Sequence, residues 1–211
     1  MVRIREYKHP RVSQVKTPQT DNTSLLVHLF KNAMAWETWL QKHLNSSTGL
    51  WMRIAKKSAK LQSVSYQEAL EVALCYGWID GQKRTYDEQS WLQKFTPRGP
   101  KSIWSKINRT KALELIRGGR MKPAGLGAIE SAKKNGRWDT AYDSHGTAVA
   151  PNDFQMALNK NAKANAFFAT LNSQNRYAIL FRIQTAKKIE TRQKRIQKFV
   201  QMLAKHEKLY P

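Results

Sequence analysis

The first half of the chain contains short apolar runs separated by polar residues, a pattern typical of β-strands. Leu25–Phe30 and Leu50–Lys56 are β-prone runs bounded by polar or turn residues, and we expect a strand at each. Trp78–Thr85 and Ser90–Phe95 flank four polar residues, which predicts a β-hairpin. Pro97 should end this hairpin, because proline has no N–H to donate to a neighbouring strand.

Helical periodicity fills the gaps between these strands. Asn32 can cap a helix whose buried face is formed by Trp36, Trp39, Leu40 and Leu44. Ser65 and Glu68 have the spacing of a capping box, in which two side chains satisfy each other's free backbone donors. Gly77 should end the helix that follows.

The second half of the chain has helical patterns throughout. Ser102 begins the first predicted helix, which runs to Arg117. Pro123 begins the next helix, and Gly136 closes it. Further helices are expected over residues 152–158, 162–171 and 174–206, the last of them broken near Thr185. The predicted fold class is α+β, with a small antiparallel sheet in the N-terminal half and a predominantly helical C-terminal half.

The same patterns suggest how the chain is divided. Residues 1–23 show little apolar periodicity and contain two prolines, so we expect a mobile leader there. Residues 24–211 are expected to form a single domain, with an α/β part over 24–100 and a helical part over 101–211. A chain of 211 residues is long enough for one substantial domain.

Composition narrows the class of protein. The chain carries 37 Lys and Arg against 15 Asp and Glu, a formal net charge of +22. No apolar run is long enough to span a membrane and no secretory signal is recognisable, so we expect a cytoplasmic protein without a transmembrane segment. Cys75 is the one cysteine, which excludes an intramolecular disulfide and a multi-cysteine zinc site. The five histidines have no ligand spacing, and neither a metal nor a cofactor is predicted.

The predicted hairpin interleaves aromatic and charged residues. Alternate residues of a strand share a face, which places on one side Trp78, Asp80, Gln82 and Arg84. The other side is expected to carry Ile79, Lys83 and Thr85, and Gly81 marks a bulge or a close backbone approach. An aromatic ring, a carboxylate and a guanidinium on one face suit a ligand platform, but they suit equally a charge pair that bridges the sheet.

A further polar group, Arg98, Lys101 and Ser102, lies at the start of the predicted helix. Helix N-terminal N–H groups, a hydroxyl and two cations are the parts of an anion site. The glycine spacing of a phosphate-binding loop is missing, which argues against nucleotide triphosphatase chemistry. Ser102 fits a helix cap better than a nucleophile, and no catalytic residue is assigned. The candidate ligand site therefore consists of Trp78, Asp80, Lys83, Arg98, Lys101 and Ser102.

The C-terminal helix is amphipathic. Its apolar arc, which we expect in the core, is formed by Ile189, Ile196, Phe199, Val200 and Leu203. The candidate basic face on the opposite side consists of Lys187, Lys188, Arg192, Lys194, Arg195 and Lys198. This face could contact DNA, RNA or anionic lipid, or it could be only solvated. Because it carries no aromatic residue, any nucleic-acid binding there would be independent of sequence.

Three separated blocks of the chain are distinctive: Ala73–Asn108, Gly119–Leu126 and Phe167–Ile196. In these blocks the chain resembles the YdeI/OmpD-associated family of bacterial proteins, which are described as bacteriocin-protection proteins, and the resemblance extends from about residue 24 to the C-terminus. It implies a role in resistance to bacteriocins or cationic antimicrobial peptides and an envelope- or porin-associated partner. It implies no reaction, cofactor or catalytic residue. A protein of net charge +22 repels cationic peptides, so such a role would be indirect.

Four functional hypotheses remain. The first is a non-enzymatic stress- or resistance-associated protein that binds an anionic partner through its basic faces. The second is a small-molecule-binding protein or enzyme with a pocket around Trp78, Asp80, Arg98 and Ser102. The others are a sequence-independent nucleic-acid binder and a structural protein whose charge only keeps it soluble. A concave pocket holding those four side chains would favour the second hypothesis. A continuous positive stripe from Arg98 through Lys106 to the C-terminal helix would favour the first.

Overall fold

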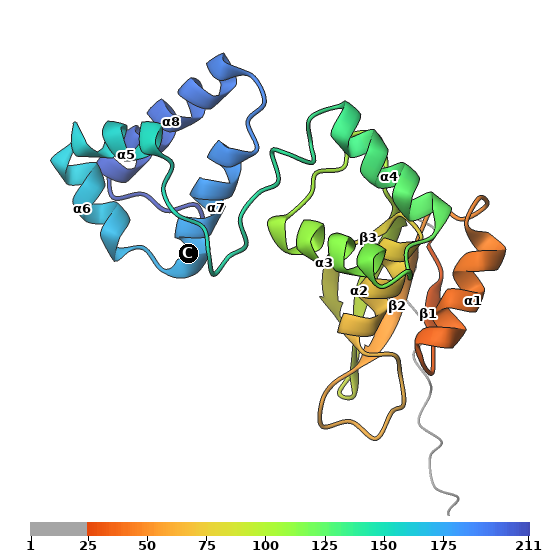
Figure 1. Ribbon diagram of the computed structural model, residues 1–211. Helices are drawn as coiled ribbons and strands as arrows, with labels where there is room; N and C mark the ends of the chain where they lie inside the picture. Colours follow the sequence, from red (N-terminus) through yellow and green to blue (C-terminus); the bar gives the residue numbers. More distant parts are fainter. Residues whose placement is uncertain (1–24) are drawn as a thin grey trace, which may run out of the picture.

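The computed structural model describes residues 25–211, and the predicted leader over residues 1–23 lies outside them. Figure 1 shows a part that contains a sheet and, beside it, a purely helical part formed by the C-terminal residues. The strands are β1 (Val27–Leu29), β2 (Leu50–Ala55), β3 (Trp78–Thr85) and β4 (Ser90–Pro97). The helices packed with them are α1 (Ala33–His43), α2 (Tyr66–Cys75), α3 (Lys106–Arg117) and α4 (Pro123–Lys134). The C-terminal helices are α5 (Asn152–Asn159), α6 (Ala162–Thr170), α7 (Ser173–Gln184) and α8 (Ile189–Ala204).

These elements confirm the predicted α+β class and most of the predicted boundaries. Asn32 caps α1, and Ser65 with Glu68 forms the expected capping box at α2. The break expected near Thr185 separates α7 from α8. The strands lie in the order β1-β2-β4-β3. β1 and β2 are parallel, which requires the crossover that α1 supplies, and the remaining pairs are antiparallel.

A β-bulge in β3 changes the faces predicted for the hairpin. Asp80 pairs with Phe95 and Lys83 pairs with Gln93, so β3 has one more residue than β4 between these pairs. The extra residue reverses the alternation of faces. Lys83 therefore shares a face with Asp80, whereas Arg84 lies on the opposite face. The predicted grouping of Arg84 with Asp80 was wrong because a period of two does not hold across a bulge.

The start of α3 also differs from the prediction. The helix begins at Lys106, and its cap is Ser105, whose hydroxyl accepts the Asn108 N–H at 3.1 Å. Ser102 instead closes a turn, because its hydroxyl accepts the Gly99 N–H at 3.0 Å. The helix start expected at Ser102 is therefore wrong, and the anion site predicted around Arg98, Lys101 and Ser102 has no helix N-terminus at Ser102.

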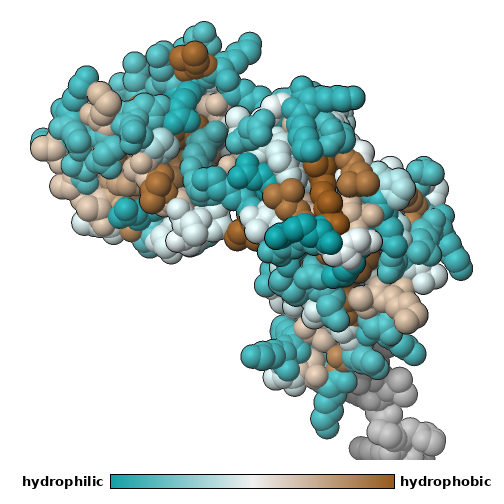
Figure 2. All heavy atoms as spheres, in the orientation of Figure 1, coloured by the Kyte–Doolittle hydropathy of each residue, from teal (hydrophilic) through white to brown (hydrophobic). Residues whose placement is uncertain are grey.

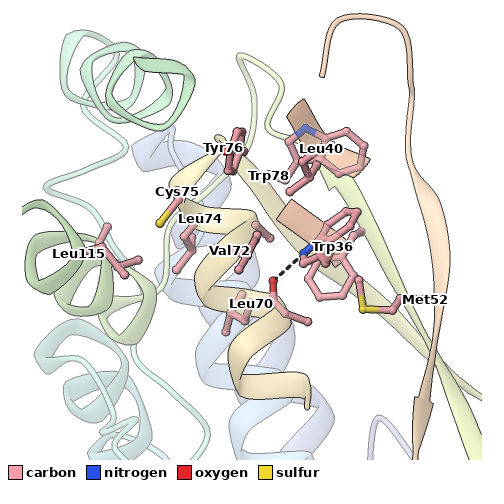
Figure 3. Close-up of a cluster of buried hydrophobic side chains, with 14 of the residues drawn as sticks. Trp36, Leu40, Met52, Leu70, Val72, Leu74, Cys75, Tyr76, Trp78 and Leu115 are labelled. Carbon is pink, nitrogen blue, oxygen red and sulfur yellow. Dashed lines mark hydrogen bonds between the residues drawn. The ribbon is translucent and has the colours of Figure 1, made fainter. Parts of the chain in front are cut away.

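The first hydrophobic cluster lies between one face of the sheet and helices α1 to α4. Trp36 of α1 packs against Trp78 and Phe95, with ring centres 5.9 and 5.8 Å away. Its indole N–H donates to the Ala69 carbonyl oxygen at 3.1 Å, the bond drawn in Figure 3. The cluster continues through α3 and α4 as far as Ala141. Packing therefore joins α3 and α4 to the sheet, although the change from strand to helix comes near residue 100.

Three tryptophans of the hairpin and the segment after it are wholly or mostly buried. Trp78 and Trp104 are 0% and 2% exposed, whereas Trp91 near the start of β4 is only partly buried. Cys75 is buried, as expected for an unreactive thiol.

Two glycines allow α4 to pack closely against the end of α2. Gly77 has a φ of +72°, the left-handed conformation that a helix stop requires. A Cβ on Gly77 would lie 2.7 Å from the Ala124 carbonyl oxygen, and a Cβ on Gly125 would overlap the Cys75 carbonyl oxygen. The position of α4 over the end of the sheet depends on both residues being glycine.

Helices α5 to α8 enclose a second hydrophobic cluster, formed around Phe154, Leu158 and Ile179. The connection to the first part is fixed by Asp143, which forms an ion pair with Lys106 at 2.5 Å and accepts a hydrogen bond from Gln184 at 2.5 Å. Figure 2 shows mostly hydrophilic residues on the visible face, with hydrophobic residues gathered between α3 and α4. Among the described residues, no helix has both the length and the apolar character needed to cross a membrane.

Candidate functional site

A cavity of about 380 Å³ lies where the ends of α1, α2 and β4 meet the side of α4. Its lining is made of Leu44, Asn45, Tyr76, Gly77, Trp78, Pro97, Arg98, Gly99, Pro100, Ser102, Trp104, Ala124, Gly127, Ala128, Ser131, Ala132 and Asn135. Among these residues Arg98 alone carries a full charge at neutral pH. The volume falls in the range of sites for small molecules.

Arg98 is held in place by its surroundings. Its guanidinium carbon lies 3.5 Å from the centre of the Trp104 ring, and its Nη1 donates to the Ile103 carbonyl oxygen at 3.1 Å. Both partners belong to the segment between β4 and α3, which folds back over the guanidinium. Ile103 and Trp104 lie in the part of this segment, from Ser102 onward, that the sequence assigned to a helix.

Three N–H groups of the cavity-lining residues are buried without a hydrogen-bond partner. They are Nε and Nη2 of Arg98 and Nε1 of Trp78. Figure 3 shows the Trp78 indole beside Trp36, whose own N–H is bonded. An unpartnered buried donor costs about 1–3 kcal/mol, and more when it is charged. These three atoms have almost no accessible surface, so protein atoms enclose them although their residues line the cavity.

The surroundings of Arg98 also disfavour its positive charge. Burial lowers the pKa of its guanidinium to about 10, and the nearby Tyr142 and Asp80 offset only part of that effect. No hydrogen bond joins Asp80 to the guanidinium, and the Asp80 carboxylate accepts the Tyr66 hydroxyl at 2.8 Å. An acceptor bound at Arg98 would restore part of the solvation that the cation loses on burial.

The structure brings together three of the six residues predicted for a ligand site. Trp78, Arg98 and Ser102 line the cavity. Asp80 lies outside the lining, and Lys101 is exposed on the turn. Lys83 lies elsewhere on the sheet, with its ammonium nitrogen 4.2 Å from the centre of the Trp91 ring. Of the four residues proposed to surround a pocket, Trp78, Arg98 and Ser102 line the cavity and Asp80 does not.

Sequence reasoning missed the wall that α4 contributes. Ala124, Gly127, Ala128 and Ser131 line the cavity from this helix. Their spacing of three and four residues places small side chains on one helical face, which leaves room beside the helix. The spacing of these small residues was visible in the sequence, but it was interpreted only as evidence for a helix and not as one wall of a cavity.

The candidate basic face on α8 is smaller than predicted. Arg192 forms a two-point ion pair with Asp153, at 2.6 and 2.8 Å, and also donates to the Ile183 carbonyl oxygen. Arg195 donates to the Arg182 carbonyl oxygen. Both arginines connect α8 to neighbouring helices, so the expectation of one open face with all six cations was wrong. The exposed residues that remain are Lys187, Lys188, Lys194 and Lys198.

The apolar arc of α8 is confirmed except at its first residue. Ile196, Phe199 and Leu203 are buried, and Val200 packs against the same cluster. Ile189 is 71% exposed, because it begins the helix at the surface. Over residues 25–211, no group of three or more His, Cys, Asp or Glu side chains is arranged to hold a metal ion.

Comparison with protein families gives two matches along the chain. Residues 28–128 match a domain of unknown function, and residues 147–206 match the family described as "Bacteriocin-protection, YdeI or OmpD-Associated". The chain carries a YdeI/OmpD-associated domain. The family expected from the sequence is thereby confirmed over helices α5 to α8. Neither a curated protein nor a solved structure matches the chain.

The YdeI/OmpD-associated domain and the cavity belong to different segments. The cavity-lining residues run from Leu44 to Asn135, largely within the match of unknown function and before residue 147. Two of the three blocks that suggested the family, Ala73–Asn108 and Gly119–Leu126, also fall in that first match. The family description links the C-terminal part to bacteriocin protection, and the chemistry of the cavity has to be inferred from its own residues.

Proposed function

We propose that this protein is a binding protein for a small anionic ligand, which occupies the cavity at Arg98. The observation that carries the proposal is Arg98, the one charged residue of the lining, which is held at the cavity by its stack on Trp104. A cation that pays the cost of burial without forming its bonds destabilises the fold. Such a residue is expected where binding has to be favoured over stability.

The lining favours binding over catalysis. Arg98 is its one charged group at neutral pH, and the other lining residues contribute only amide, hydroxyl and indole groups. General acid–base or nucleophilic catalysis needs a titrating group in contact with the substrate. The proposal is therefore a receptor or carrier, and the anion class follows from the charge of Arg98.

The match of residues 147–206 to the YdeI/OmpD-associated family supports a bacteriocin-protection type of role for this binding protein. We propose that protection is indirect, since a net charge of +22 opposes direct capture of cationic peptides. In this proposal the protein is cytoplasmic, and the ligand state of the cavity controls contact with an envelope-associated partner.

A second candidate function, binding of an anionic macromolecule, has one specific observation in its favour. A surface hollow of about 630 Å³ beside the turn of the hairpin is lined by Lys56, Lys57, Lys83, Arg84, Thr85 and Trp91. No acidic residue lines it. Titration of a mixed-sequence single-stranded oligonucleotide against wild type and a Lys56→Gln, Lys57→Gln double variant tests this candidate, and equal affinities would reject it.

The main proposal is tested by filling the cavity without touching Arg98. A Cβ on Gly127 would have no neighbour within 4 Å, so Gly127→Leu adds bulk to the cavity wall and Gly127→Ala is a matched control. In a thermal-shift screen of small carboxylates, phosphates and sulfonates, at least one anion should stabilise wild type and Gly127→Ala but not Gly127→Leu. If no anion in the screen distinguishes the two variants, the proposal is wrong.

A further inference from the structure

We propose that the exposed side of α8 binds double-stranded DNA, with the helix in the major groove, glutamine side chains on the base edges and lysine side chains on the phosphates. This surface lies in the C-terminal part, apart from the cavity at Arg98, so its partner is additional to the small anion. The evidence is the way in which the fold divides the polar side chains of α8 between internal contacts and solvent.

The two arginines of α8 are bonded within the protein. Arg192 forms an ion pair with Asp153 of α5 and donates to the Ile183 carbonyl oxygen of α7. Arg195 donates to the Arg182 carbonyl oxygen, also on α7. The apolar arc of the helix is buried in the second hydrophobic cluster. These contacts fix the rotation of α8 about its axis, and therefore fix which of its residues face solvent.

The exposed side of α8 carries two parallel rows of polar side chains. Residues four positions apart lie one above the other on a helix. One row consists of Gln193, Gln197 and Gln201, the neighbouring row contains Lys194 and Lys198, and all five residues are exposed. In Figure 1 α8 forms the upper edge of the helical part, so a partner could approach it from outside.

The charge of this side favours a polyanion. Lys187 and Lys188 are exposed directly before the helix, and Lys194 and Lys198 continue the positive charge along it. Glu190 is the one acidic residue of α8. Lysines that follow one side of a helix can contact successive phosphates of a nucleic-acid backbone.

Other anionic partners fit this side less well. A helix on a lipid surface inserts its apolar arc, but the apolar arc of α8 is buried. Single strands are held largely by stacking on aromatic rings, which the exposed rows lack. The major groove of double-stranded RNA is too narrow for side chains to read. Protein interfaces are centred on aromatic residues and arginine, and the arginines of α8 are bonded internally. Duplex DNA is the partner that remains.

The glutamine row supplies contacts to the bases. A glutamine amide both donates and accepts, so it can bind N6 and N7 of adenine together in the major groove. Gln193 and Gln201 are separated by about 12 Å along the helix axis, which corresponds to roughly three or four base pairs. Lysines alone would bind DNA independently of sequence, whereas the glutamine row predicts a preference for adenine.

Fluorescence-anisotropy titration of the full chain tests the proposal. The probes are a short A·T duplex, the same duplex with 7-deazaadenine in place of adenine, a G·C duplex of equal length, and one separated strand of the A·T duplex. The modified base lacks the N7 acceptor in the major groove but keeps its base pair and its minor groove. It therefore removes the adenine contact without changing the charge of the DNA.

Three variants are compared with wild type. One replaces Lys194 and Lys198 with Gln, and its charge-matched control replaces Lys31 and Lys42, which are exposed in the first part. The third variant replaces the glutamine row with alanine, a residue that favours the helix. Circular dichroism confirms that each variant is folded.

Wild type should bind the A·T duplex more tightly than the modified duplex, the G·C duplex and the single strand, by roughly fivefold or more. The Lys194→Gln, Lys198→Gln variant should bind every duplex more weakly, with a slope of log affinity against log salt reduced in magnitude by about 2. The control pair should keep the slope of wild type. The alanine variant should bind the three duplexes with equal affinity.

Three results would overturn the proposal. Wild type could bind none of the duplexes, or the two lysine-pair variants could lose the same affinity. Tighter binding of the single strand than of its duplex would also reject it and would favour the hollow at Lys56 and Lys57. Equal affinity of wild type for the adenine and 7-deazaadenine duplexes would exclude the glutamine row as a reader of bases. The cavity is tested separately, by the anion screen with Gly127→Leu.

Discussion

The guanidinium of Arg98 lies over the indole of Trp104, with its central carbon 3.5 Å from the ring centre. Trp104 is itself fixed by Trp138, whose ring centre is 4.9 Å away at an interplanar angle of 68°. The orientation of Arg98 is therefore set by the protein before any ligand binds. A preorganised cation loses little entropy on binding, which favours affinity for a small ligand.

Replacing Arg98 should make the protein more stable. We expect Arg98→Met to raise the free energy of unfolding by about 1–2 kcal/mol, because two unpartnered buried N–H groups disappear while an apolar contact with Trp104 remains. The lost stacking and the lost bond to Ile103 offset part of the gain. Urea denaturation measures the change. A decrease of more than about 2 kcal/mol would show that Arg98 serves stability and would contradict its assignment to binding.

Gly77 should be less tolerant of alanine than Gly136, although both have a φ near +70°. Either substitution costs about 1–2 kcal/mol for the left-handed conformation. Gly77→Ala should cost a further 1–3 kcal/mol, roughly, because its Cβ meets the Ala124 carbonyl oxygen, whereas Gly136 faces open space. The two unfolding midpoints give the comparison, and equal losses would mean that α4 does not pack against Gly77 as described.

Ligand binding should weaken at high pH. An anion needs the charged form of Arg98, and burial lowers the pKa of that group to about 10. The affinity for the anion should therefore be constant between roughly pH 7 and pH 9 and fall as the pH rises through about 10. Titration calorimetry at each pH measures this, with far-ultraviolet circular dichroism to confirm that the protein is folded. Undiminished affinity of the folded protein at about pH 11 would exclude Arg98 as the anion receptor.

The ion pair between Asp153 and Arg192 should make helices α5 and α8 sensitive to acid. Hydrogen bonding from Arg192 lowers the pKa of Asp153. A carboxyl group with a lowered folded-state pKa adds stability above its unfolded pKa, and that stability is lost as the pH falls through the folded value. Asp153→Asn should cost about 0.5–1 kcal/mol at pH 7, discounted for the partial exposure of the pair, and less near pH 3. Asp139→Asn, at an exposed position, is the control, and a loss independent of pH would contradict this role.

The elements could be predicted from sequence wherever a local signal dominates. The caps at Asn32 and Ser65 and the stop at Gly77 depend on hydrogen bonds and backbone angles within a few residues, so the pattern contains them. The bulge after Asp80 could be suspected from Gly81, but its effect on Arg84 depends on pairing with β4. Such pairing is a property of two strands and cannot be read from one.

The candidate site was only partly predictable for the same reason. Arg98 and Trp78 stood out by residue type, and the structure places both at one cavity. Arg98 stacks on Trp104, and the helix begins only at Lys106. This arrangement depends on tertiary packing, which cannot be read from local helical periodicity. Arg192 and Arg195 looked like surface charges because their partners, Asp153 and the Arg182 carbonyl oxygen, lie far away in sequence or on another helix.

The most direct test of the account follows the indole N–H of Trp78 by ¹H–¹⁵N correlation spectroscopy during addition of an anion that stabilises wild type in the thermal-shift screen. Trp78→Phe identifies its signal among those of the seven tryptophans. The account predicts that this signal and the Nε–H signal of Arg98 shift together and saturably, while the bonded Trp36 signal does not move. A ligand that binds saturably without moving either the Trp78 or the Arg98 signal would contradict it.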